Sequence, residues 1–110
     1  MSFDPLAVAE PETKELYAHL LKALSKSVKF KEEKKKTCIH LVRTSAFAGV
    51  HARKKHLVIT IKAPGPIASE RVFKSEQVSK SRWHHELKLA SRAEIDVELL
   101  CWLQQGYEIS

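Results

Sequence analysis

The chain has 110 residues, of which 44% are hydrophobic and 29% charged, the size and composition of one globular domain. We therefore predict a single domain over residues 1–110, in which residues 1–10 form a flexible N-terminal segment. No hydrophobic run approaches the roughly 18 residues that a membrane-spanning helix needs, and the acidic, proline-containing start is unlike a signal peptide. We expect a cytoplasmic protein with no membrane partner.

The net charge is +6, and the basic residues are concentrated in the middle of the chain. Residues 22–88 carry a net charge of +12, whereas residues 1–21 and 89–110 each carry −3. Such segregation favours a polyanionic partner, either nucleic acid or an acidic protein. The alternative is that the basic residues keep a sheet face soluble and protect its edges.

An amphipathic helix is predicted over residues 11–25. Pro11 suits a first helical turn, and Leu16, Leu20 and Leu24 recur every four residues. This apolar stripe requires a partner surface.

The middle of the chain alternates in a way typical of strands. The two clearest segments are TCIHLVR and HLVITIK, and two weaker candidates, RVFKSEQV and RWHHELKL, follow a loop APGPIAS at residues 63–69. A final helix is predicted after a capping box formed by Ser91 and Glu94, and Gly106 would provide its C-terminal cap.

These elements predict an α+β fold. Short connections require antiparallel strands, because a parallel crossover needs about a dozen residues. We expect a two-layer sandwich in which an antiparallel sheet of about five strands carries the N-terminal and C-terminal helices on one face.

The segment AFAGVHARKKHLVITI indicates which residues share each face of the sheet. A four-residue loop over residues 52–55 would pair His51 with His56 and Val50 with Leu57. The core face would then be wholly apolar. It would comprise Ala46, Ala48, Val50, Leu57, Ile59 and Ile61.

The opposite face would carry Phe47, Gly49, Val58 and Thr60, and His40 is also expected on this open face. Either the face contacts nucleic acid, with cations on phosphates and Phe47 stacking on bases, or another element such as the loop 63–69 covers it. The candidate nucleic-acid- or anion-binding residues are Arg43, Phe47, His51, Arg53, Lys54, Lys55, Lys62, Lys80, Arg82 and His84.

The six histidines do not form a recognisable metal or catalytic motif. His84 and His85 are adjacent on a strand, so their side chains point to opposite faces. His51 and His56 could reach a common ion, but the neighbouring cations oppose it. No nucleophile elbow, phosphate-binding glycine loop or zinc-binding helix motif is present. We predict no catalytic residues, no metal site and no cofactor.

The stretches KKTCIHLVRTSAFAGVHARKKHLVITIK and SEQVSKSRWHHELKLASRAEIDVELLCWLQQGYEIS resemble a bacterial family known as a domain of unknown function (DUF5655-like), some members of which are labelled "predicted transport protein". The similarity starts at about Tyr17 and includes Lys36, the AFAGV strand, a basic hairpin, a late Trp-His strand and a helix ending in Tyr107.

Members of this family also occur attached to restriction-type nuclease domains, which implies a nucleic-acid partner. The late strand and final helix are also similar to the YjbR-like and YdhG-like group, which includes proposed DNA-binding proteins and shares a broad topology with frataxin. The resemblance implies no active site. The iron-binding acidic helix ridge of frataxin is not expected here, because the first helix has acidic residues only at its start and the sheet is basic.

Two functions are compatible with these observations. The first is a non-enzymatic binding module that contacts nucleic acid or another acidic partner through the basic sheet face and hairpin. The alternative is a small-molecule or protein-interaction domain with a pocket near Phe47, Trp83 and His85. We expect His85 to be partly buried and hydrogen-bonded, and His84 to lie on the open face.

Overall fold

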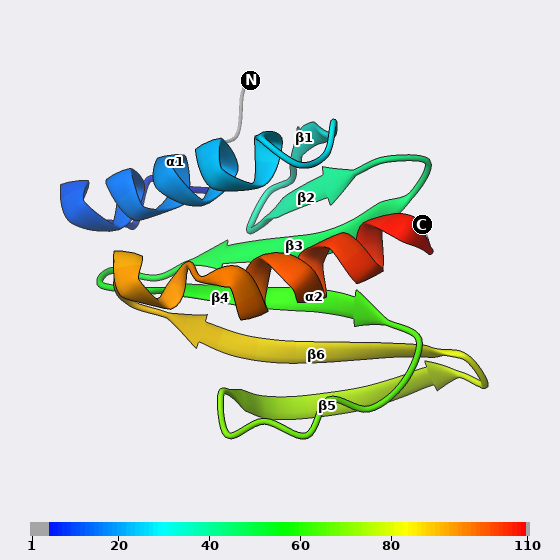
Figure 1. Cartoon of the computed structure of the whole chain (residues 1–110). Coiled ribbons are helices and arrows are strands. Elements are labelled where there is room, and N and C mark those ends of the chain that lie inside the picture. The colour runs from blue at the N-terminus through cyan, green and yellow to red at the C-terminus, as the bar shows by residue number, and fades with distance from the viewer. Residues whose placement is uncertain (1–4, 110) are drawn as a thin grey trace.

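The computed structural model describes residues 5–109, which form an α+β fold with a six-stranded antiparallel sheet (Figure 1). The elements in chain order are α1 (Pro11–Ser25), β1 (Lys31–Lys34), β2 (Ile39–Val42), β3 (Ala46–Ala52), β4 (Leu57–Ala63), β5 (Val72–Ser79), β6 (Arg82–Leu89), the 3-10 turn η1 (Arg92–Glu94) and α2 (Val97–Glu108). The predicted class is confirmed, with six strands rather than about five. Residues 1–4 of the predicted N-terminal segment lie outside the described residues, and Ala9 within that segment is buried.

The strands are ordered β1-β2-β3-β4-β6-β5, and each neighbouring pair is antiparallel. The edge strand β1 has the sequence KEEK and is exposed throughout. Charged side chains on an edge discourage pairing with another chain. Strand β6 lies between β4 and β5, so the Trp-His segment is inside the sheet rather than at its edge.

Helix α2 lies across β3 and β4 on one face of the sheet, and α1 lies beside α2 (Figure 1). The apolar stripe of α1 is buried as predicted, with Leu20 and Leu24 fully inaccessible to solvent. These leucines belong to the same core cluster as Ile59 and Ile61 of β4 and Leu103 of α2. Within residues 5–109, neither helix is long and apolar enough to cross a membrane.

The β3–β4 hairpin confirms the predicted faces but corrects the predicted register. Val50 pairs with Ile59 instead of Leu57, and Ala52 pairs with Leu57. The turn is tighter than expected, because the backbone N–H of Arg53 donates to the carbonyl of His56 at 2.8 Å. The shift amounts to two residues, and since side chains alternate with period two, the apolar residues other than Ala46 stay on the core face.

A β-bulge corrects the prediction for Phe47 and Ala46. Val42 pairs with Ala46 while Leu41 pairs with Ala48, so Phe47 is the extra residue. The bulge turns the Phe47 ring to the helix side, where it is fully buried. Ala46, predicted on the core face, is half-buried and faces the other way.

The Phe47 ring packs edge-on against two aromatic rings, with centroid distances of 6.2 Å to Phe30 and 5.4 Å to Tyr107. It is therefore a core residue, and its proposed stacking on a base at the open face is wrong.

The final helix begins later than predicted. Glu94 does accept the backbone N–H of Ser91 at 3.0 Å, but this capping box starts the 3-10 turn η1. Helix α2 has its own cap, because the Asp96 carboxylate accepts the backbone N–H of Leu99 at 3.0 Å.

Gly106 is not a helix cap but the contact point between α2 and the sheet. The helix continues to Glu108, and Gly106 has no positive φ. A Cβ at this position would lie 2.6 Å from the carbonyl oxygen of Lys62 and 3.0 Å from that of Phe47. Glycine is required here because the helix touches strand backbone directly.

We predict that Gly106→Ala destabilises the protein although alanine is the better helix former. The backbone oxygens cannot move aside cheaply, so overpacking of about 1–3 kcal/mol should outweigh a helix-propensity gain of about 1 kcal/mol. Urea unfolding measures the change. Gln105→Ala, at an exposed position of the same helix, is the control and should stay within about 0.5 kcal/mol of the wild type. A Gly106→Ala protein as stable as the wild type would contradict this account of the contact.

Candidate functional site: a histidine-lined hollow

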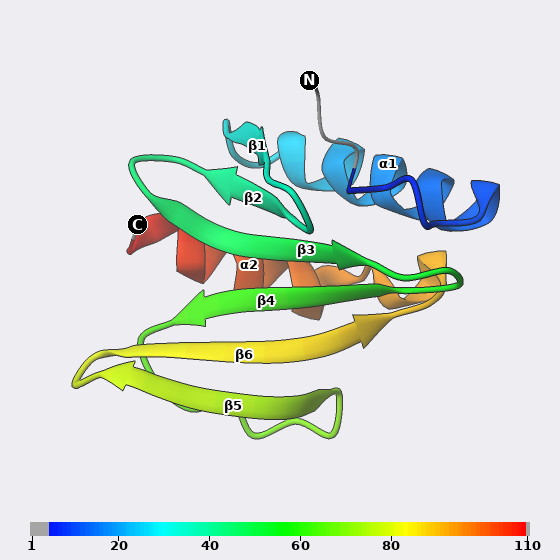
Figure 2. The ribbon, with the colours of Figure 1, turned by 180° about the vertical axis from the view of Figure 1, so that it is seen from behind.

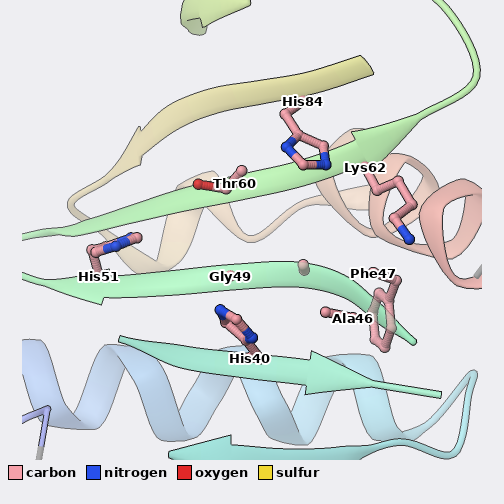
Figure 3. Close-up of a pocket in the computed structure, with 9 residues that line it drawn as sticks. His40, Ala46, Phe47, Gly49, His51, Thr60, Lys62 and His84 are labelled. Carbon is pink, nitrogen blue, oxygen red and sulfur yellow. The ribbon is translucent and has the colours of Figure 1, made fainter. Parts of the chain in front are cut away.

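The face of the sheet opposite α2 contains a shallow hollow of about 230 Å³ (Figure 3). Figure 2 shows this face with the strands in front of α2. Residues from four strands line it: His40, Ala46, Phe47, Ala48, Gly49, His51, Thr60, Lys62 and His84. We call it the open-face hollow.

Cross-strand pairing places these side chains together. Gly49 of β3 lies between His40 of β2 and Thr60 of β4, and it pairs with both. Two residues further along β4, Lys62 pairs with His84 of β6. Because Gly49 has no side chain, the centre of this row is low, and the side chains of His40 and Thr60 lie on either side of it (Figure 3).

Two carboxylates flank the hollow, and each is paired with a lysine. Glu33 is the cross-strand partner of His40, and its carboxylate lies 3.2 Å from the Lys35 ammonium. Glu86 is the cross-strand partner of Thr60, and its carboxylate lies 3.5 Å from the Lys74 ammonium. The hollow therefore has acidic groups at both ends of the row that contains Gly49.

The imidazole of His51 is held toward its uncharged form. Burial lowers its pKa, the positive charge of Arg53 lowers it further, and the carboxylate of Glu86 acts in the opposite direction. In its uncharged form this ring presents a flat aromatic surface, and one of its nitrogen atoms donates a hydrogen bond while the other accepts one.

Within residues 5–109, no group of three or more His, Cys, Asp or Glu side chains is arranged to hold a metal ion. The suggested pairing of His51 with His56 is also wrong, because His51 pairs with Val58. His56 instead closes the hairpin turn with Arg53.

The predicted cations do not form one patch. Arg43 donates to the carbonyl of Tyr107 at 3.1 Å, and its guanidinium lies 4.6 Å from the centre of the Tyr107 ring. Arg82 donates to the carbonyl of Ile109 at 3.3 Å. Both arginines thus bind the carbonyl end of α2, where the helix dipole favours positive charge.

The other predicted cations lie at opposite ends of the sheet. Arg53, Lys54 and Lys55 are exposed at the β3–β4 turn, whereas Lys80 is exposed at the β5–β6 turn. The seven residues of β4 separate these ends by roughly 20 Å. Lys62 lies on the open face and donates to the Ser45 hydroxyl at 3.2 Å.

The predicted pocket near Phe47, Trp83 and His85 is not formed by these three side chains. His85 is fully buried, as expected, and Trp83 stacks on it with a centroid distance of 5.8 Å. The Gly65 carbonyl accepts from Nε2 of His85 at 2.9 Å, and the Ser75 hydroxyl bonds Nδ1 at 2.8 Å. The loop 63–69 therefore covers His85 on the helix side, and Phe47 packs elsewhere.

Four of the predicted residues border the hollow, namely Phe47, His51, Lys62 and His84, although the Phe47 side chain is fully buried. His40 joins them. Sequence reasoning placed His40, Gly49 and Thr60 on this face but did not predict a hollow. The available signal was Gly49, a glycine inside an otherwise regular strand, which often marks a close approach of another group.

The model of the family described as "Domain of unknown function (DUF5655)" matches residues 6–110. The chain belongs to this family. Searches of the curated proteins and of the solved structures found no significant match. The DUF5655 fold is thus represented here by a sheet with one face under α2 and a histidine-lined hollow on the other.

The adjacent histidines provide a matched test of the two faces. We predict that His85→Ala lowers the free energy of unfolding by about 2–4 kcal/mol, because it leaves a cavity in the core and removes the hydrogen-bond partner of the Ser75 hydroxyl and of the Gly65 carbonyl. His84→Ala, one residue away and half-buried on the open face, should change it by less than about 1 kcal/mol. Urea unfolding of both variants measures the difference, and equal losses would contradict the assignment of faces.

The hairpin histidines should make stability depend on pH. Burial lowers the pKa of His56 as well, with Lys88 and Arg53 adding to the effect, so the unfolded chain binds these protons more readily than the folded one. Stability is therefore retained above the ordinary histidine value of 6.5 and falls as the pH drops below it.

We expect the double variant His51→Gln/His56→Gln to reduce this fall in stability. Urea midpoints measured at about pH 7.5, 6.5 and 5.5 test it. A double variant that loses as much stability as the wild type over this interval would show that other groups cause the fall.

Proposed function

We propose that this protein is a non-enzymatic binding module that holds single-stranded nucleic acid on the open face of its sheet. The observation that carries the proposal is the open-face hollow, where three imidazole rings and a lysine gather on a face that α2 does not cover. Flat rings on an exposed sheet suit unpaired bases, and cations around them suit the backbone.

The distribution of charge supports the same proposal. Lys62 lies at one end of the hollow, and the cations of the β3–β4 turn extend from the other end beyond His51. Phosphates would contact these cations while the bases lie over the hollow. Arg43 and Arg82 are excluded from this role, because they bind the carbonyl end of α2.

The proposal predicts a salt-dependent affinity for single strands. A labelled oligonucleotide of roughly twelve nucleotides should bind to this face. If about four phosphates are contacted, the logarithm of the association constant should fall with the logarithm of the salt concentration with a slope near −3. Fluorescence anisotropy between about 50 and about 200 mM salt measures it. The triple variant Arg53→Ala/Lys54→Ala/Lys55→Ala should bind more weakly and flatten the slope by about 2.

The matched control removes the same charge from α1 and its C-cap, in the triple variant Lys14→Ala/Lys22→Ala/Lys26→Ala. These lysines are exposed on the helix layer, so this variant should keep most of the affinity. Equal losses in the two triple variants would mean that net charge alone attracts the oligonucleotide. No binding at low salt would overturn the proposal and leave an acidic protein as the partner to test.

A further inference from the structure

Gly49 determines the depth of the open-face hollow, although neither the backbone nor the packing requires glycine there. No described glycine has a positive φ, so the conformation of Gly49 is open to any residue. A Cβ on Gly49 would lie 3.8 Å from Cβ of Thr60 and 3.9 Å from Cδ2 of His40, which is ordinary van der Waals contact. What the missing side chain provides is space above the strand.

The size of this space restricts its occupant to one small group. Pockets for drug-sized ligands hold about 300–1,000 Å³, and the hollow of about 230 Å³ is smaller. It is not an enclosed cavity, so a group attached to a longer chain can enter it.

The chemistry of the walls favours a flat, uncharged group over a phosphate. The imidazoles of His40, His51 and His84 offer faces for stacking, and the Thr60 hydroxyl can donate or accept a hydrogen bond. The carboxylates of Glu33 and Glu86 border the same row of residues, and because each is paired with a lysine they add no unpaired charge to it.

We propose that the open-face hollow holds one unpaired base of a bound single strand, stacked on imidazole and seated over Gly49. This inference rests on the proposed function and specifies which part of the strand enters the hollow. The phosphates on either side of this base stay outside it, on Lys62 and on the β3–β4 turn. A base inside a duplex is stacked on both sides and cannot enter without leaving the helix, so the site prefers single strands.

The test combines a variant that fills the hollow with an oligonucleotide that lacks bases. Gly49→Val should fold normally, because its Cβ meets only ordinary contacts and valine favours strands. Removing one stacked base should cost about tenfold in affinity. We therefore expect the wild type to bind an abasic strand of the same length about tenfold more weakly than the intact strand.

Gly49→Val should bind the intact strand about tenfold more weakly than the wild type does, and it should lose little more when the bases are removed. The salt slope should be the same for both proteins, because the phosphate contacts are retained. Urea unfolding checks the fold of Gly49→Val, and Gly49→Ala, which fills less of the space, should give an intermediate loss. If Gly49→Val does not fold, the comparison is made with Gly49→Ala.

The outcomes separate this inference from the proposed function. If the wild type binds intact and abasic strands equally, or if the Gly49 variants lose the same factor on both strands, the base does not occupy the hollow. The function would then stand and this inference would fail. If neither strand binds at low salt, both fail.

Discussion

The direct contact of α2 with the backbone of β3 and β4 is the constraint on which the rest of the fold depends. Gly106 brings the helix against the carbonyls of Phe47 and Lys62, with no side chain between them. This approach allows Tyr107 to meet the Phe47 ring and holds α2 over the centre of the sheet. One face of the central strands is thereby sealed, and the polar residues of the same strands are left on the other face.

The sequence predicts those parts of the fold that depend on regular alternation. Helix α1 was predicted with its observed bounds because Pro11 and the leucine stripe are local signals. The core set on β4 was also predicted, since every second residue is a large apolar side chain. The error of two residues in the hairpin register did not change which residues share a face, because a shift by an even number of residues leaves each side chain on the same side of the sheet.

The failures occur where alternation is interrupted or where distant segments meet. The bulge at Phe47 moves Ala46 and Phe47 to the opposite faces from those predicted, and no local sequence pattern indicates the bulge. The role of Gly106 depends on strands more than forty positions earlier, so its sequence neighbours suggested only a helix cap. The predicted cations do not share one surface. The length of the strands places some of them at opposite ends of the sheet, and Arg43 and Arg82 bind carbonyls at the end of α2.

The anchoring of the β3–β4 turn has a thermodynamic consequence for any ligand. The carbonyl of Lys54 accepts two hydrogen bonds from the start of α1, from the backbone N–H of Glu10 at 2.9 Å and from the Thr13 hydroxyl at 3.0 Å. The main chain of the turn is thus held in place before binding, so the conformational entropy that the turn loses on complex formation comes mainly from its lysine and arginine side chains. The turn acts as a preorganised cationic arm, although its composition alone resembles that of a flexible loop.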